Sequence, residues 1–384
     1  MKVILTLCLS FVIVFVSSLD VNAQNTEDSS LKQSIDELSD DLGLSEFYNQ
    51  LPSETKDTFK DLGINSISIT ELSSVSFSSV INEIFDIGSK ESKTVFSSLG
   101  LVIAVLLLYS LVEGFMQNIT AVTMREVLSV VSTLCIACLL VIPITNVIDM
   151  AGRAIRMSCQ FMLAFIPLMV TVIVSSGNSL SGAGYYSLMV FAAEGIAQLS
   201  SKFITPMLNV FLGVSICSTV VPQLKLQSIT DLFSKTIKWL LSFSFTIFSA
   251  LLTFRTLIAT SIDSVSTRAV RFTMSSFIPV VGAALSEAYK TVQGSINILK
   301  NGMGVFVIFA VAFVFLPVVL RLLLWSFSIN ICKTVAEVLG ISIPGRMLMS
   351  VGTVLSVLLA VVLCVMALFI ISTALIITVG GKSS

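Results

Sequence analysis

From Val95 onward the chain is a series of long apolar runs, and one of them, Val351–Val379, extends over 29 residues without a charged side chain. Only the lipid interior, or burial in protein on all sides, accommodates a stretch of this length and composition. Hydrophobic residues make up 55% of the 384 residues and charged residues only 12%. The sequence therefore predicts an all-α polytopic membrane protein.

The chain contains no histidine, which removes the commonest general base, proton relay and zinc ligand. It has no phosphate loop, no serine-hydrolase motif and no paired carboxylates at a usable spacing. The pair Cys135 and Cys138 lies inside an apolar run without a matching second pair, which favours helix packing over a metal or redox site. We expect passage or assembly rather than enzyme chemistry, with no cofactor, no metal and no nucleic-acid partner.

Residues 1–23 have the pattern of a secretory signal peptide. Lys2 precedes the apolar run Val3–Val16, and Val21-Asn22-Ala23 is a small-x-small cleavage site. The alternative is an uncleaved first membrane anchor, although 14 apolar residues are few for a span.

Residues 24–93 form an acidic segment with 14 acidic residues and 5 lysines, whereas residues 94–384 carry 16 basic and 8 acidic ones. We expect a small helical, extracytoplasmic region followed by the multi-pass body. Arg125 and Lys225 then fit loops on the cytoplasmic face, where basic residues accumulate. The acidic region is either a docking surface for an extracytoplasmic partner or a solvated spacer.

The body contains about seven to eight predicted transmembrane helices. The candidate segments are Phe96–Val112, Val127–Val147, Cys159–Val174, Tyr185–Leu199, Phe203–Val221, Ile237–Ala259, Val305–Trp325 and Val351–Val379. The segment Arg271–Lys290 is too short to span and contains Pro279 and Gly282. It is a candidate re-entrant or interfacial hairpin. The backbone N–H and C=O groups of such a hairpin need hydrogen-bond partners from protein or from a water-lined cavity. The alternative is an ordinary loop on the membrane surface.

Two parts of the chain, 127–221 and 237–325, carry similar motifs in the same order. Each has an acid, two arginines, a Phe-Ile-Pro tripeptide and a later proline: Asp149, Arg153, Arg156, Pro167 and Pro206 in the first, and Asp263, Arg268, Arg271, Pro279 and Pro317 in the second. Internal duplication is frequent in transport folds, so we predict an internal repeat. Chance similarity between apolar sequences is the alternative.

The acids and arginines of the two copies are candidate structural or pore residues. Asp149 and Arg153 are four residues apart, so on a helix they can pair near the membrane boundary; Asp263 and Arg268 hold the corresponding places. Glu194 lies inside a predicted span, where an ionisable residue usually faces a bundle interior or cavity. These residues either surround an aqueous opening or serve orientation and packing.

Three further stretches are more distinctive: Arg271 with Phe277-Ile278-Pro279-Val280-Val281-Gly282, the run Lys300-Asn301-Gly302-Met303-Gly304, and the apolar run after Pro344-Gly345-Arg346. With the signal peptide, the acidic region and the multi-pass body, they give a chain that resembles the stage III sporulation protein AE family over essentially its whole length. Pro279 and Gly282, which we predict to form a non-helical break, and Gly302 and Gly304 are also candidate structural or pore residues.

The resemblance implies a membrane subunit of a channel or secretion-like complex that connects mother cell and forespore. It implies a place in the mother-cell-derived outer forespore membrane, with residues 24–93 on the extracytoplasmic side. The implied partners are the lipid bilayer, other membrane subunits of the complex and extracytoplasmic ring proteins that bind residues 24–93. The resemblance carries over no site residue, because the family has no agreed functional motif to match. The alternative function is a stand-alone secondary transporter or permease.

Overall fold

The computed structural model describes residues 48, 51, 53–64, 77–116, 122–220, 227–277 and 282–378. The predicted signal peptide (1–23), most of the acidic region before α4, and Pro279 lie outside the described residues.

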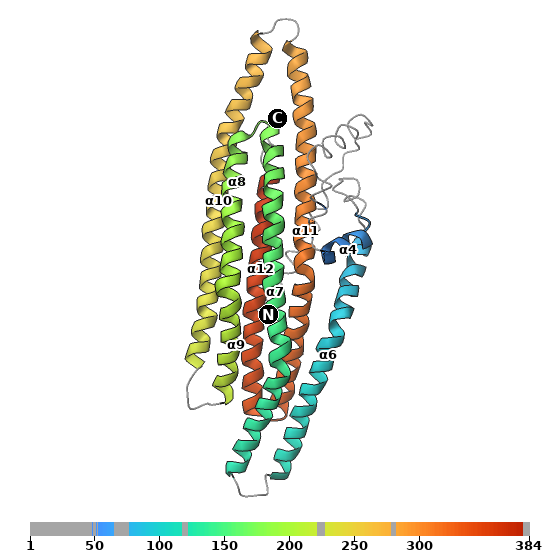
Figure 1. The fold of residues 1–384 in the computed structure, drawn as a ribbon, viewed down its shortest axis with the longest axis vertical. Coiled ribbons are helices and arrows are strands. Elements are labelled where there is room, and N and C mark those ends of the chain that lie inside the picture. The colour runs from blue at the N-terminus through green and yellow to red at the C-terminus, as the bar shows by residue number, and fades with distance from the viewer. Residues whose placement is uncertain are drawn as a thin grey trace.

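The described residues form helices and no strand (Figure 1). Antiparallel long helices run up and down along one direction, and each is joined to the next by a short connection. Their bounds are α4 Ser53–Asp61, α6 Phe77–Met116, α7 Val122–Ser175, α8 Ser179–Leu199, η1 Ser200–Ile204, α9 Thr205–Val220, α10 Gln227–Phe277, α11 Gly282–Val338 and α12 Ser342–Thr378. The predicted all-α polytopic fold is confirmed.

The eight predicted membrane segments lie on six helices that are long and apolar enough to cross a membrane. Val127–Val147 and Cys159–Val174 are two parts of the 54-residue helix α7. Tyr185–Leu199 and Phe203–Val221 lie along a second helix, in which α8 continues into α9 through the π-helical turn η1. The predicted count of about seven to eight is roughly consistent with these six helices, since two of them each contain two of the predicted segments and charged residues interrupt the apolar sequence without ending the helix.

Two helix ends depend on glycine in the left-handed region. Gly177, with φ +86°, ends α7, and Gly340, with φ +72°, ends α11. In each case the next residue donates its backbone N–H to a carbonyl five residues earlier: Asn178 to Ile173 at 3.2 Å and Ile341 to Ala336 at 2.9 Å. This cap satisfies the free carbonyls of the last turn, so the chain reverses within three residues at both places.

The core lies where α7, α9, α11 and α12 meet. The largest fully buried side chains of the bundle include Phe165, Phe211, Phe306, Phe315 and Phe369. Helices α11 and α12 approach especially closely, since a Cβ built on Gly304 would lie in contact with the side chain of Ile377. α10 is the outermost helix on one side of the bundle and α6 lies towards the other (Figure 1).

The part of the acidic region that the structure describes packs against the bundle through aromatic rings. Phe59 of α4 lies edge-on to Phe306 and Phe313 of α11, with ring centroids 5.5 and 5.6 Å apart. The Tyr48 hydroxyl donates a hydrogen bond to the Ile64 carbonyl at 2.8 Å. The structure has no break at the predicted boundary, Lys93, because α6 begins at Phe77 and continues into the apolar segment.

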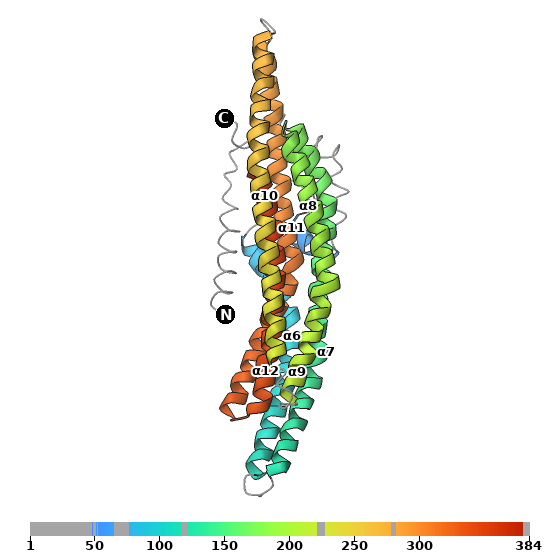
Figure 2. The ribbon, with the colours of Figure 1, turned by 90° about the vertical axis from the view of Figure 1, so that its left-hand side faces the viewer.

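The hairpins are staggered along the bundle. The tip of the α10–α11 hairpin projects beyond the turn between α7 and α8, and the α6–α7 hairpin projects at the opposite end (Figures 1 and 2). The candidate re-entrant segment Arg271–Lys290 is therefore the tip of a long helical hairpin: Arg271–Phe277 complete α10 and Gly282 begins α11.

Candidate functional site

An ion pair joins two helices that are far apart in sequence. The Arg321 guanidinium of α11 forms two hydrogen bonds with the Glu91 carboxylate of α6, one of them from Nη2 to Oε1 at 2.5 Å. Its Nη1 lies 3.0 Å from Sδ of Met150 on α7. The side chains are 31% and 17% exposed. A bidentate, partly buried pair of this kind holds α6, α7 and α11 in one register.

Further charged residues lie at the height of this pair. Asp149 precedes Met150, and Arg153 follows it by less than one turn. Gly152 lies against Thr205 of α9, which places Lys202 of η1 within one turn of the same height. We call Glu91, Asp149, Arg153, Lys202 and Arg321 the charged layer. It crosses the bundle where the apolar runs of α7 and of α8–α9 are interrupted.

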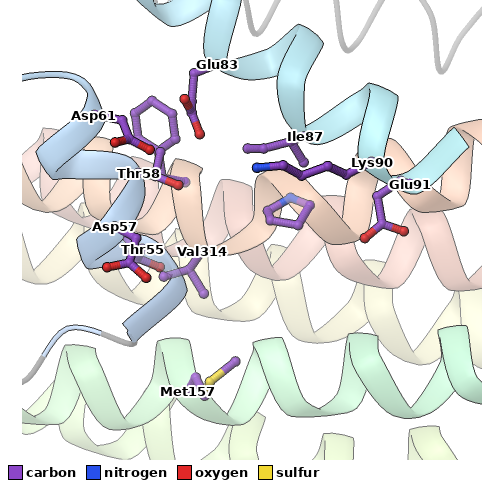
Figure 3. Close-up of a pocket in the computed structure, with 12 residues that line it drawn as sticks. Thr55, Asp57, Thr58, Asp61, Glu83, Ile87, Lys90, Glu91, Met157 and Val314 are labelled. Atoms are coloured by element: carbon purple, nitrogen blue, oxygen red, sulfur yellow. The ribbon is translucent and has the colours of Figure 1, made fainter.

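A cavity of about 270 Å³ lies beside the ion pair (Figure 3). Its acidic side chains come from α4 on one side and α6 on the other, and α7 and α11 contribute Met157, Phe313 and Pro317. The charged lining residues are Asp57, Asp61, Glu83, Lys90 and Glu91. Lys90 forms an exposed ion pair with Asp86 at 2.6 Å. Four carboxylates and one ammonium give the cavity an acidic lining, which attracts cations or basic groups.

Of the acid–arginine pairs predicted from the repeat, only the first has described side chains at both positions. Asp149 is half-buried and Arg153 is exposed, and no ion pair joins them in the described structure. Burial does not force the exposed guanidinium onto the neighbouring carboxylate, so their spacing alone does not form a pair.

The second pair lies far from the first along the bundle. Phe211 of α9 stacks on Phe233 of α10 with ring centroids 6.2 Å apart, and Thr205 lies against Gly152. Trp239 is therefore level with Gly152, and Asp263 lies about 36 Å higher at 1.5 Å per residue. Arg268 of α10 is exposed. The first copy of the predicted repeat falls on the hairpin α7–α9 and the second on α10–α11, but their charged motifs do not meet around one opening.

The remaining predicted residues lie in different surroundings. Glu194 is exposed on α8, Gly282 begins α11, and Gly302 and Gly304 are buried in α11. A side chain at Gly304 would overlap Ile377 of α12. Gly304 is thus a packing residue that lets two helices approach closely.

In the described part of the chain, no group of three or more His, Cys, Asp and Glu side chains could hold a metal ion.

The family model for stage III sporulation protein AE matches residues 61–380, from the end of α4 to beyond the end of α12. The chain belongs to this family. It is 25% identical over 234 residues to the stage III sporulation protein AE of Bacillus subtilis (strain 168), which is 61% of this chain and 59% of that protein. No solved structure matches.

The family assignment and the six apolar helices together describe a sporulation-related membrane protein. The matched region contains the whole helical bundle, the charged layer and the run Lys300–Gly304. Lys300 is only 1% exposed, an unusual degree of burial for a lysine, and Gly302, Met303 and Gly304 are buried beside it, whereas Asn301 is exposed.

The sequence did not predict the Glu91–Arg321 pair. It also did not predict a polar contact between α11 and the α7–α8 turn, in which the Gln293 amide donates a hydrogen bond to the Ser176 carbonyl at 2.7 Å. The isolated Arg321 in an apolar run was a usable signal, because such a residue needs a counter-charge. Its partner, 230 residues away, follows only from the tertiary fold.

Proposed function

We propose that this chain is a membrane subunit of a channel or secretion-like complex that connects mother cell and forespore and that forespore development requires. The observation that carries the proposal is the family match across the whole helical bundle. The helices support it. At 1.5 Å per residue the six long helices measure about 56 to 86 Å, well beyond the roughly 30 Å of a hydrocarbon core. A chain of this shape fits a transenvelope assembly better than a permease confined to the bilayer.

The proposed location is the mother-cell-derived outer forespore membrane, with α4 and the acidic region on the extracytoplasmic side. Arg125 lies near the start of α7 and Arg346 near the start of α12, both towards the opposite end from the α10–α11 tip. Basic residues at one end support a cytoplasmic position for that end.

The proposed partners are other membrane subunits of the same complex, together with extracytoplasmic ring proteins that bind the acidic region. The described part of that region presents Asp57, Lys60 and Asp61 as exposed side chains beside the acidic cavity. This surface suits a basic partner, because opposite charges steer association. We propose a structural or pore-forming role and no enzymatic one.

The test is deletion of the gene and complementation with a tagged chain in the sporulating host. We expect sporulation to stop after engulfment begins, and the tagged chain to copurify with other membrane proteins made at that stage. Normal spores from the deletion strain, or a tagged chain that purifies alone, would overturn the proposal.

The alternative, a stand-alone secondary transporter, is favoured by the predicted internal repeat. Purified chain in liposomes separates the two. Substrate-coupled flux without any other protein supports the transporter, whereas its absence together with copurified subunits supports the complex.

A further inference from the structure

The exposed face of α7 changes from apolar to basic at the height of the charged layer. On the side of the α6–α7 hairpin this face carries Val131, Leu134 and Ile142, which are between 45% and 69% exposed. Spacings of three, four, seven and eleven residues keep side chains on one face of a helix, and the same face continues with the exposed Arg153 and Arg156. Two arginines therefore project outward from a helix that is apolar enough to cross a membrane.

The Arg156 guanidinium lies over the seam between α7 and α9. A Cβ built on Gly152 would lie 3.7 Å from Nη1 of Arg156 and 2.9 Å from Oγ1 of Thr205, so the guanidinium and the hydroxyl are next to the same point. Lys202 is exposed on η1, three residues before Thr205, and η1 packs against α7. Because α7 and η1 run in opposite directions, Arg156 and Lys202 lie at nearly the same height. We call Arg153, Arg156 and Lys202 the basic seam.

The cations of the basic seam have no counter-charge from the chain itself. Among the residues that the structure describes, no carboxylate lies within ion-pair distance of any of the three. Asp149 is half-buried on α7, and Glu194 lies on α8 eight residues before Lys202, about two turns away. A guanidinium carries five N–H donors and no acceptor, and the strongest hydrogen bonds of such a group go to carboxylates and phosphates. The exposed seam is therefore available to an anion from outside the chain.

Exposed apolar side chains lie next to the basic seam, on the same side of it in both helices. On η1 and α9, Phe203 is 62% exposed and Val210 is 52% exposed, and on α7 Ile142 is 69% exposed. All three lie from the seam towards the α6–α7 hairpin (Figure 1). Outward-facing cations avoid hydrocarbon, and basic pockets between membrane helices bind anionic lipid headgroups. A ligand that covers both surfaces has an anionic head and apolar tails, whereas a free phosphate covers only the cations.

We infer that the basic seam binds the headgroup phosphate of an anionic phospholipid, whose acyl chains lie along α7 and α9 towards the α6–α7 hairpin. The planar guanidinium of Arg156 donates two parallel hydrogen bonds to phosphate oxygens, and the Thr205 hydroxyl beside it donates a third. Lys202 and Arg153 add positive charge, which favours a headgroup with a net negative charge over a zwitterionic one. This inference is independent of the proposed function, because either can fail without the other.

The test is a titration of the full chain, purified in mild detergent and stripped of native lipid, with phosphatidylglycerol. Bound lipid is counted by native mass spectrometry. In the variant Arg156→Gln with Lys202→Gln we expect the dissociation constant to rise about 25-fold, because each lost charge contributes about fivefold. Both side chains are exposed, so the fold is retained, and the unfolding midpoint without lipid checks this. The matched control is Lys235→Gln with Lys238→Gln, which removes the same charge from exposed positions of α10 and should leave the affinity unchanged.

Further comparisons identify the ligand. Phosphatidylcholine should bind more weakly than phosphatidylglycerol, and inorganic phosphate should not displace the bound lipid. The charge-conserving variant Arg156→Lys with Lys202→Arg should retain most of the affinity that the glutamine variant loses. The inference is overturned by a wild-type chain that binds no phosphatidylglycerol, by equal affinity for the two lipids, or by displacement with inorganic phosphate. Wild-type affinity in the glutamine variant, an equal loss in the α10 control or an equal loss in the charge-conserving variant would contradict it as well.

Discussion

Helices α12 and α10 are both apolar and both long, yet they differ in how much of their surface the rest of the chain buries. In the most apolar stretch of α12, 61% of the residues are buried within the chain, compared with 17% in α10. α12 has apolar residues around its whole circumference and lies in the core. α10 has apolar residues on an inner and an outer face, with hydroxyl residues between them. An apolar segment therefore identifies a helix that avoids water, and only its pattern around the helix shows what covers it.

The largest effect expected from this comparison is on stability. Phe369→Ala in α12 removes a side chain that is fully buried, so the free energy of unfolding should fall by about 3–5 kcal/mol through lost packing and the cavity left behind. Phe254→Ala in α10 removes a side chain that is 67% exposed and should change it by less than about 1 kcal/mol in detergent. Thermal unfolding of the purified variants checks both values. Equal losses would show that α10 and α12 do not differ in burial.

The Glu91–Arg321 pair should come next. Arg321→Ala leaves a partly buried carboxylate without its partner, which should cost about 2–3 kcal/mol, between the values for buried and exposed pairs. The double variant with Glu91→Gln should recover part of this loss because it also removes the orphaned charge. The control is Lys333→Ala, which breaks the pair with Glu337 at 3.5 Å within one helix and should cost about 0–0.5 kcal/mol. If Arg321→Ala leaves the free energy of unfolding unchanged, the Glu91–Arg321 pair does not hold α6 in place.

The fold class follows from the sequence because apolar runs longer than about 20 residues have few structural solutions. The point at which each helix ends does not follow as directly. Asp149 and Arg153 interrupt the apolar pattern of α7, as Lys202 does in α8–α9, and a sliding comparison of hydropathy treats such an interruption as a loop. A helix ends only where turn chemistry is available. Gly177 and Gly340 provide it with a positive φ, whereas Gly152, between Val147 and Cys159, stays within the helix.

The candidate site was less predictable. The individual residues of the charged layer were visible, since ionisable groups stand out in an apolar chain, but their partners were not. The spacing of Asp149 and Arg153 predicts an ion pair between them. The structure instead has an ion pair between Arg321 and Glu91. Spacing along one helix reports possible neighbours on that helix, and contacts between helices depend on the stagger of the hairpins.

Close approach of α11 and α12 gives a smaller effect with a well-matched control. Gly304→Ala places a methyl group against Ile377, which should cost about 1–3 kcal/mol through overpacking. Ile377→Ala in the same chain should relieve part of it. Gly294→Ala is in the same helix with open space around the new methyl group, so it should be neutral or stabilise by about 0.5–1 kcal/mol. Thermal unfolding midpoints report all three. A neutral Gly304→Ala would show that α12 can shift away from α11 without loss.

The smallest effect concerns the attachment of the acidic region, which distinguishes a docked surface from a solvated spacer. Tyr48→Phe keeps the ring on Phe306, at a centroid distance of 6.3 Å, and removes the hydroxyl that donates to Ile64 at 2.8 Å. The loss should be about 1 kcal/mol, the usual net contribution of one hydrogen bond. It should appear as faster proteolysis between α4 and α6, with the bundle's unfolding midpoint unchanged, because the bond lies outside the bundle's own contacts. Tyr186→Phe, at a tyrosine that is 47% exposed on α8, is the control and should alter neither readout. If Tyr48→Phe leaves the cleavage rate at the wild-type value, the hydrogen bond does not hold this region. In that case the ring contacts of Phe59 with Phe306 and Phe313 are sufficient to keep α4 on the bundle.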